Sequence, residues 1–281
     1  MIWKTPRATL DLSRRARVMG ILNVTPDSFS DGGRHAGTQA ALDHARRMIA
    51  EGADIIDIGG ESTRPGAQPV SAEEETARVF PVIRALRDEW DGLISIDTMK
   101  AGVALAALGA GADIVNDVSG LRADPHMTAL CATAGCGVLV MHMLGEPRTM
   151  QLAPHYDDVV AEVRAFFLER METLTAAGIA PEALCFDPGI GFGKNLEHNL
   201  SLLRALGSLA PHDRPLLLGA SRKSFIARLL ENDDLAMRHW PTVAITALAR
   251  GKGVMLHRVH DVRANREALR MIEAVIAREI Q

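Results

Sequence analysis

Polar side chains recur at the ends of short apolar runs along this chain, at Asn23, Asp57, Asp97, Asn116, His142, Asp187, Ser221, Lys223 and His260. A carboxylate inside a packed core is costly unless it is neutralised. Where parallel strands end, the same carboxylate can meet solvent and substrate. A single Asp or Asn could merely cap the following helix. The repetition of the pattern favours one shared site that binds a polar ligand.

Basic residues near these run ends are few and specific. Arg64 follows a Ser-Thr pair, Arg222 and Lys223 are adjacent, and Arg258 stands two residues before His260. A guanidinium group binds phosphate oxygens in a bidentate way, and a lysine adds a compact charge. A lone arginine is usually solvated surface charge, but each of these follows an expected strand end. They predict an anionic, phosphorylated small molecule, and the Asp and Asn side chains suit a heterocycle rich in N–H donors.

A glycine-rich stretch, Pro188-Gly-Ile-Gly-Phe-Gly-Lys194, invites comparison with nucleotide-binding loops. It is not a P-loop, because its spacing is one residue too short and Asn195 replaces the required Ser or Thr. It also lacks the Rossmann spacing. We expect instead a close approach of backbone to a flat ligand, with Phe192 supplying a packing face.

Eight βα units must place these residues. Strands are expected at 18–23, 54–58, 93–97, 113–118, 137–142, 184–187, 215–219 and 254–259, with helices at 38–51, 71–90, 99–108, 124–134 and 155–177 and after each later strand. Units of roughly 35 residues suit a closed barrel, and the alternation implies a parallel sheet. Gly-Ala-Asp-Ile-Ile at 52–56 recurs as Gly-Ala-Asp-Ile-Val at 111–115. Residues 1–281 are therefore expected to form one (β/α)8 TIM barrel domain, in preference to an open doubly wound sheet.

Two of the predicted connections, 25–37 and 59–70, are unusually long. Each has about a dozen residues, against a usual length of roughly 2–6. Both are rich in Gly, Pro and Ser. Loops of this kind next to a site are typical of functional lids.

Composition excludes several classes of protein. The 281 residues carry 31 basic and 35 acidic side chains, a net charge of −4, with no long run of one sign. That argues against a nucleic-acid partner or a polybasic membrane patch. The start of the chain lacks the apolar stretch of a signal peptide, and no apolar run is long enough to span a membrane. Three cysteines are interpreted as buried thiols in a reducing compartment, so a cytoplasmic protein is expected.

Read together, these motifs resemble those of the dihydropteroate synthase family, in the family's order and over nearly the whole chain. Met19-Gly-Ile-Leu-Asn-Val-Thr-Pro-Asp-Ser-Phe-Ser-Asp-Gly-Gly33 is similar to the first signature and Asp57-Ile-Gly-Gly-Glu-Ser-Thr-Arg-Pro-Gly66 to the second. Further matches are Ser95-Ile-Asp-Thr98, Asn116-Asp-Val-Ser-Gly120, Val140-Met-His142, Asp187-Pro-Gly-Ile-Gly-Phe-Gly-Lys194, Ser221-Arg-Lys-Ser224 and Arg258-Val-His-Asp-Val262. Departures are small: Leu144 stands where Gln is frequent, and Lys252-Gly-Val where Gly-Ala is common.

The resemblance implies a TIM barrel, a homodimer and a transferase of folate biosynthesis. Its reaction condenses 7,8-dihydropterin-6-ylmethyl diphosphate with 4-aminobenzoate and releases pyrophosphate and 7,8-dihydropteroate. The implied course is a dissociative substitution, in which diphosphate leaves first and the aryl amine captures the methylene cation. Two rivals share the barrel: a methyltetrahydrofolate-dependent methyltransferase module and a non-catalytic pterin-binding paralogue. The motifs 221–224 and 258–260 favour the synthase, because the methyltransferase module would not need this anion-binding set. A non-catalytic paralogue would lack one or more of the motif residues, and all are present.

The resemblance also implies roles for individual residues. The pterin pocket would comprise Asp97, Asn116, Met141, Asp187, Phe192, Gly219 and Lys223. The diphosphate would bind Asn23, Thr63, Arg258 and His260, with Mg²⁺ held by Asn23 and phosphate oxygens. The 4-aminobenzoate would contact Phe29, Thr63, Arg64, Pro65, Lys223 and Ser224. The catalytic residues would be Asp31, which steadies the cation, together with Lys223, Arg258 and His260.

Overall fold

The computed structural model of the chain describes residues 1–25, 33–62, 67–146 and 149–277. Its centre is an eight-stranded parallel sheet with the strand order β8-β7-β6-β5-β4-β3-β10-β9. The strands are β3 (Arg17–Asn23), β4 (Ile55–Gly59), β5 (Leu93–Asp97), β6 (Ile114–Asp117), β7 (Gly137–Met141), β8 (Leu184–Asp187), β9 (Leu217–Leu218) and β10 (Leu256–Val259). Phe186 pairs with Leu216, and its N–H donates to the Pro215 carbonyl over 3.0 Å. This pairing joins the two edge strands, so the predicted barrel is confirmed.

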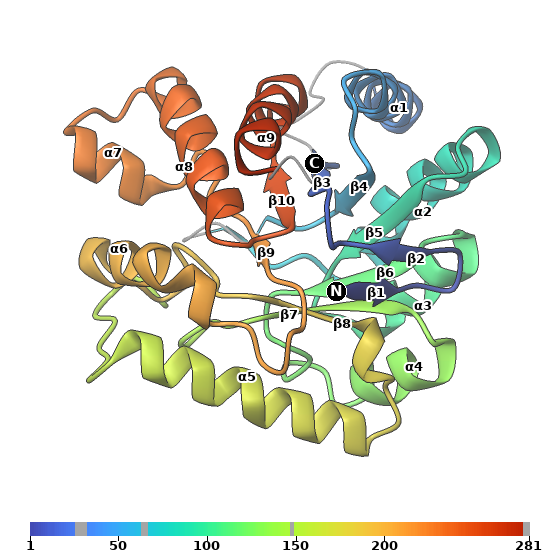
Figure 1. Cartoon of the computed structure of the whole chain (residues 1–281). Coiled ribbons are helices and arrows are strands. Elements are labelled where there is room, and N and C mark those ends of the chain that lie inside the picture. The colour runs from blue at the N-terminus through green and yellow to red at the C-terminus, as the bar shows by residue number, and fades with distance from the viewer. Residues whose placement is uncertain (26–32, 63–66, 147–148, 278–281) are drawn as a thin grey trace.

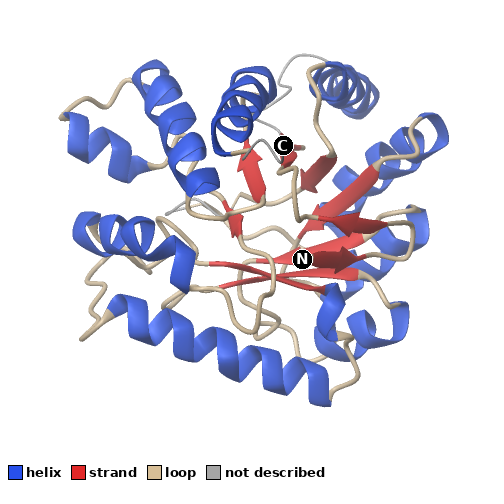
Figure 2. Ribbon diagram, viewed as in Figure 1, coloured by secondary structure: helices blue, strands red, loops and turns tan. Residues whose placement is uncertain are grey.

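Helices surround the barrel in chain order, so that α9 and α1 lie next to each other and complete the ring (Figures 1 and 2). The helices are α1 (Gly33–Ala50), α2 (Ala72–Glu89), α3 (Ala101–Ala110), α4 (Met127–Ala134), α5 (Val159–Ala176), α6 (Leu196–Ala205), α7 (Ser224–Leu230), α8 (His239–Gly251) and α9 (Val262–Ile276). Short polar side chains cap several of them at the carboxyl end of the barrel. Asp158 accepts from two backbone N–H groups of α5, and Asp261 accepts from Ala264 N of α9. These caps satisfy N–H groups that have no partner within the helix.

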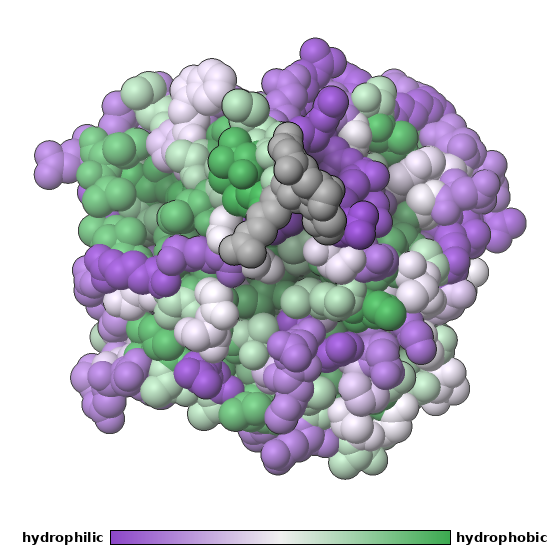
Figure 3. All heavy atoms as spheres, viewed as in Figure 1, coloured by the Kyte–Doolittle hydropathy of each residue, from purple (hydrophilic) through white to green (hydrophobic). Residues whose placement is uncertain are grey.

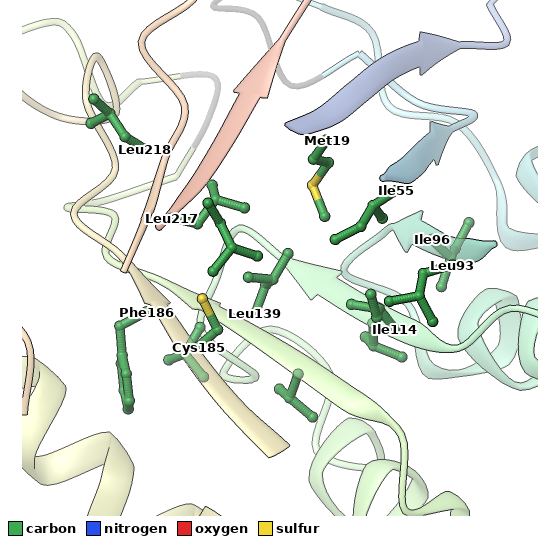
Figure 4. Close-up of a cluster of buried hydrophobic side chains, with 14 of the residues drawn as sticks. Met19, Ile55, Leu93, Ile96, Ile114, Leu139, Cys185, Phe186, Leu217 and Leu218 are labelled. Carbon is green, nitrogen blue, oxygen red and sulfur yellow. The ribbon is translucent and has the colours of Figure 1, made fainter. Parts of the chain in front are cut away.

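The strands are buried on both faces, as their apolar sequences require. Met19, Leu139, Cys185 and Leu217 come from different strands and point toward the barrel interior (Figure 4). Phe186 points the other way, toward α5, where its ring centroid lies 5.0 Å from that of Phe167. Alternate residues of one strand thus fill the barrel and the layer between sheet and helices.

An antiparallel hairpin covers the amino-terminal end of the barrel, where only a short lead-in was expected. It pairs β1 (Ile2–Lys4) with β2 (Thr9–Asp11). Trp3 is fully buried, and its indole N–H donates to the Ala183 carbonyl over 2.8 Å, just before β8. The opposite, carboxyl end therefore remains for a ligand. None of the described helices is long and apolar enough to cross a membrane.

Candidate active site at the carboxyl end of the barrel

A guanidinium and two carboxylates form the centre of this end of the barrel. Arg258 Nε donates to Asp57 Oδ2 and Nη2 donates to Asp97 Oδ2, each over 2.6 Å. Asn116 Nδ2 also donates to Asp57 Oδ2, over 3.2 Å. Asp97 and Asn116 are partners in the register of β5 and β6, which sets them side by side. The four residues come from β4, β5, β6 and β10, so the barrel itself brings the strand-end polar residues together.

The pKa values of Asp97 and Arg258 in this cluster are set by burial and by their opposite charges. Burial raises the pKa of Asp97 to about 7, while Arg258 opposes the rise and Asp57 adds to it. Burial alone would lower the pKa of the Arg258 guanidinium, but Asp57 and Asp97 raise it above its ordinary value. Arg258 therefore stays charged, whereas Asp97 can exchange a proton near neutral pH.

Asp187 ends β8 and faces the same opening. Its Oδ1 accepts from Gly189 N over 2.7 Å. A Cβ built at Gly219 would lie 3.4 Å from Asp187 Oδ2, so the absence of a side chain there leaves room beside this oxygen. Burial raises the pKa of Asp187 to about 6, against the lowering effects of the Gly189 N–H, Lys223 and Arg258. A carboxylate in this setting is an acceptor ready for a ligand with adjacent N–H donors.

A small apolar cluster lies at this end of the barrel, separate from the main core. It is formed by Val118, Met141, Met143, Met150 and Phe192. The Lys223 ammonium lies 4.0 Å from the centroid of the Phe192 ring, a cation–π contact. An apolar wall next to a cation and a carboxylate suits a flat, polar ring system, as expected for the glycine-rich stretch.

Three of the four residues expected to bind diphosphate lie among the described residues: Asn23, Arg258 and His260. Asn23 ends β3 and is half-buried. His260 follows β10, and its backbone N–H donates to Ser221 Oγ over 3.2 Å, while that hydroxyl lies 3.0 Å from the ring Nδ1. The hydroxyl can donate its own proton to Nδ1, and a neutral ring then carries its proton on Nε2, an atom able to donate to an anion. Arg258 is engaged with two carboxylates, so any anion must share it with them.

The remaining predicted residues divide into two groups. Ser224 is exposed at the first position of α7, directly after Lys223. The predictions for Phe29, Asp31, Thr63, Arg64 and Pro65 lie outside the described residues.

Sequence reasoning missed two sets of contacts. Asp57 appeared as a strand-end carboxylate but not as the buried partner of Arg258, which lies 201 residues away in the chain. Glu61 was not singled out, yet its Oε1 accepts from Val70 N over 2.9 Å and its Oε2 accepts from Lys100 Nζ over 2.8 Å. Glu61 thus links the two ends of the second long loop and ties them to the segment before α3. The sequence offered one signal for these contacts: Asp57 and Glu61 belong to the same motif at the end of a predicted strand.

Comparison with known proteins agrees with this geometry. The family model "Pterin binding enzyme" matches residues 19–260. The dihydropteroate synthase of Escherichia coli K12 is 49% identical over 269 residues, covering 96% of this chain and 94% of that protein. A Yersinia pestis dihydropteroate synthase in complex with a sulfonamide drug superposes with a TM-score of 0.91 at 47% identity, covering 98% and 99% of the two chains. A Xanthomonas albilineans dihydropteroate synthase with 4-aminobenzoic acid gives 0.90 at 46% identity, covering 98% and 100%.

These matches extend over nearly the full length of both partners in each comparison. The chain therefore belongs to the dihydropteroate synthase family.

Proposed function

We propose that this chain condenses 7,8-dihydropterin-6-ylmethyl diphosphate with 4-aminobenzoate, yielding 7,8-dihydropteroate and pyrophosphate, at the carboxyl end of its barrel. The observation that carries the proposal is the convergence of Asp97, Asn116, Asp187 and Lys223 at one opening beside an apolar wall. Family membership and the relative solved with 4-aminobenzoic acid support the same chemistry.

The pterin ring fits the carboxylates and the wall. The aminopyrimidinone edge presents adjacent N–H donors, which ionised Asp187 accepts, while Asn116 both donates and accepts. Lys223 donates to the ring carbonyl. Met141 and Phe192 supply apolar contact surface, and the absence of a side chain at Gly219 leaves room for the ring beside Asp187. Asp97 completes the pocket from β5.

The diphosphate arm would bind Asn23, Thr63, Arg258 and His260. Among the described residues no group of three His, Cys, Asp or Glu side chains is arranged to hold a metal ion, and the half-buried Asn23 offers one hard oxygen. This donor set fits Mg²⁺ that is held mainly by phosphate oxygens, with Asn23 as its protein ligand. When bound, Mg²⁺ neutralises charge on the leaving diphosphate.

The chemical step breaks the bond between the methylene carbon and the diphosphate oxygen, and both electrons leave with the oxygen. Arg258 and His260 Nε2–H would stabilise the negative charge that develops on the leaving diphosphate. The aryl amine of 4-aminobenzoate then forms the new C–N bond and loses a proton afterwards. Asp31 would steady the cation, and the second substrate would contact Phe29, Thr63, Arg64, Pro65, Lys223 and Ser224. Because an aryl amine is already neutral, its attack on the methylene cation needs correct orientation more than a strong base.

We further propose a cytoplasmic homodimer with residues 1–281 as one pterin-binding domain. Exposed apolar side chains gather over α7 and α8, among them Leu229, Leu248 and Trp240, with Trp240 73% exposed (Figure 3). An apolar patch of this kind marks a protein interface, and a second copy of the chain is its proposed partner. The described cysteines are buried free thiols, which fits a reducing compartment. A continuous core from β3 to β10 supports a single domain.

The direct test is a coupled assay with both substrates and Mg²⁺. We expect one 7,8-dihydropteroate for each pyrophosphate released, and release that depends on 4-aminobenzoate. Omission of 4-aminobenzoate is the matched control. Pyrophosphate release without a C–N product, or no turnover of the pterin diphosphate, would contradict the proposal.

A further inference from the structure

Lys194 ends the glycine-rich stretch but turns away from solvent. Only 1% of the residue is exposed. Its ammonium lies 3.0 Å from His142 Nδ1, and it donates to the carbonyl oxygens of Phe192 over 3.0 Å and His142 over 3.3 Å. An ammonium has three donors, and here it finds three neutral acceptors. The proposed reaction gives this buried lysine no role.

The protonation state of His142 fixes the direction of the contact. Burial lowers the pKa of Lys194 to about 7, while Asp187 opposes that change. Burial, together with Lys194 and Arg122, lowers the pKa of His142 to about 2. His142 is therefore neutral, so its Nδ1 accepts from Lys194 and its proton resides on Nε2.

The stretch that Lys194 ends lies directly on the segment after β7. A Cβ at Gly189 would collide with the carbonyl oxygen of His142, and one at Gly193 would lie 2.5 Å from that of Leu144. Both glycines have positive φ, +66° and +63°, which other residues rarely adopt. Tyr156 adds a hydroxyl that donates to Gly193 O over 2.9 Å. The contact is close at both glycines, and Lys194 is the basic group beside it.

Phe192 connects this buried contact to the ligand pocket. Its carbonyl accepts from Lys194, and its ring lies in the apolar cluster at the pocket, 4.0 Å from the Lys223 ammonium. Any shift of the Phe192 backbone therefore moves the surface on which the pterin and Lys223 rest.

We infer that Lys194 is a positioning residue for pterin binding: through the Phe192 carbonyl, and with His142 as its second anchor, it fixes the Phe192 ring in the pterin pocket. The inference rests on the proposed function, because the pterin is the ligand whose affinity it governs. Burying an ammonium is costly. Lys194→Met removes that cost but leaves the acceptors unpaired, so its two effects on the free energy of unfolding oppose each other. The lysine thus contributes to the geometry of the pocket more than to the stability of the fold.

The experiment compares Lys194→Met with Lys252→Met. Lys252 also donates to a backbone carbonyl, that of Arg204 over 3.0 Å, but at the surface before β10. Pterin dissociation constants are measured by calorimetry and melting temperatures by scanning calorimetry. Lys194→Met should raise the pterin Kd by roughly tenfold, since it leaves polar acceptors unpaired and the ring loosely held. Its melting temperature should stay within a few degrees of wild type, and Lys252→Met should match wild type in both measurements.

A double-mutant cycle with Phe192→Leu separates positioning from a general structural role. If Lys194 acts through Phe192, the double variant should bind pterin about as weakly as the weaker single variant, because interacting residues are not additive. Additive losses, or an unchanged Kd in Lys194→Met, would overturn the inference. If Lys194→Met does not fold, His142→Phe is the variant that tests the inference. It keeps an aromatic ring at the position that packs on Phe166, where the His142 and Phe166 centroids lie 4.9 Å apart, and it removes the Nδ1 acceptor. Weaker pterin binding by this folded variant supports the inference, and unchanged binding overturns it. Failure of the wild-type protein to bind pterin would instead contradict the proposed function itself.

Discussion

Asp187→Asn separates the contribution of this carboxylate to function from its cost to the fold. The substitution keeps an oxygen that can accept from Gly189 N and replaces the second oxygen with an NH2 group. Burial raises the pKa of Asp187 from 3.8 to about 6. Each pH unit corresponds to about 1.4 kcal/mol, so ionisation at neutral pH costs the folded state on the order of 3 kcal/mol.

The sign of the pH dependence follows from the raised pKa. The folded state takes up a proton more readily than the unfolded chain, so the cost of ionisation is absent below about pH 4 and complete above about pH 6. Asp187→Asn should therefore be more stable than wild type at pH 7.5, by up to about 3 kcal/mol, and nearly equal to it at pH 4. Pterin affinity should change in the opposite direction, falling at least about tenfold, because an NH2 donor would face the N–H donors of the ring.

Urea unfolding at the two pH values, together with pterin calorimetry at pH 7.5, measures both effects. Asp88→Asn is a suitable control, because Asp88 is an exposed carboxylate of α2 that pairs only with Arg84 among the described residues. The control should leave pterin affinity unchanged and show no gain in stability at pH 7.5. An Asp187→Asn variant that is less stable at both pH values, or one that binds pterin as wild type does, would refute the reasoning.

Three further expectations test other parts of the site. Lys223→Ala should lower kcat/KM at least about tenfold with an unchanged circular dichroism spectrum, because polar atoms of the pterin lose their partner; wild-type kinetics would remove Lys223 from the site. Mg²⁺ should bind the protein alone weakly and much more tightly once pyrophosphate is present, and calorimetry that finds tight uptake without pyrophosphate would be inconsistent with Asn23 as the main protein ligand. Trp240→Glu should shift the proposed dimer toward monomer in light scattering, since a charge placed in an apolar interface is costly, and an unchanged dimer mass would place the interface elsewhere.

The barrel could be predicted from local sequence, because buried strands and their turns leave a local pattern. The expected strands 93–97 and 184–187 match β5 and β8 to the residue. β9 was predicted as 215–219 but spans only Leu217–Leu218. Pro215 has no N–H for a ladder, and Gly219 lies beyond the last paired residue of β9. The amino-terminal hairpin was missed because its contacts are distant in the chain, such as that of Trp3 with a residue 180 positions away.

The site was predictable in composition but not in its internal contacts. The strand ends placed Asp97, Asn116 and Asp187 together, since parallel strands share one carboxyl edge. The spacing of residues in the sequence does not predict which way a long side chain points. Arg258 is expected to bind diphosphate, and spacing did not show that it also binds Asp57 and Asp97. Lys194 similarly looked like the end of a loop, and only tertiary packing shows that it is buried.

A crystal structure of the protein with a bound pterin tests the central claim most directly, because the claim concerns which side chains meet the ring. We expect the aminopyrimidinone edge against Asp187 and Asn116, the ring carbonyl at Lys223, and one face of the ring toward Phe192 and Met141. Arg258 should lie between Asp97 and the diphosphate arm. A pterin bound elsewhere, or one in this pocket that leaves Asp187 without a contact to the ring, would contradict the account.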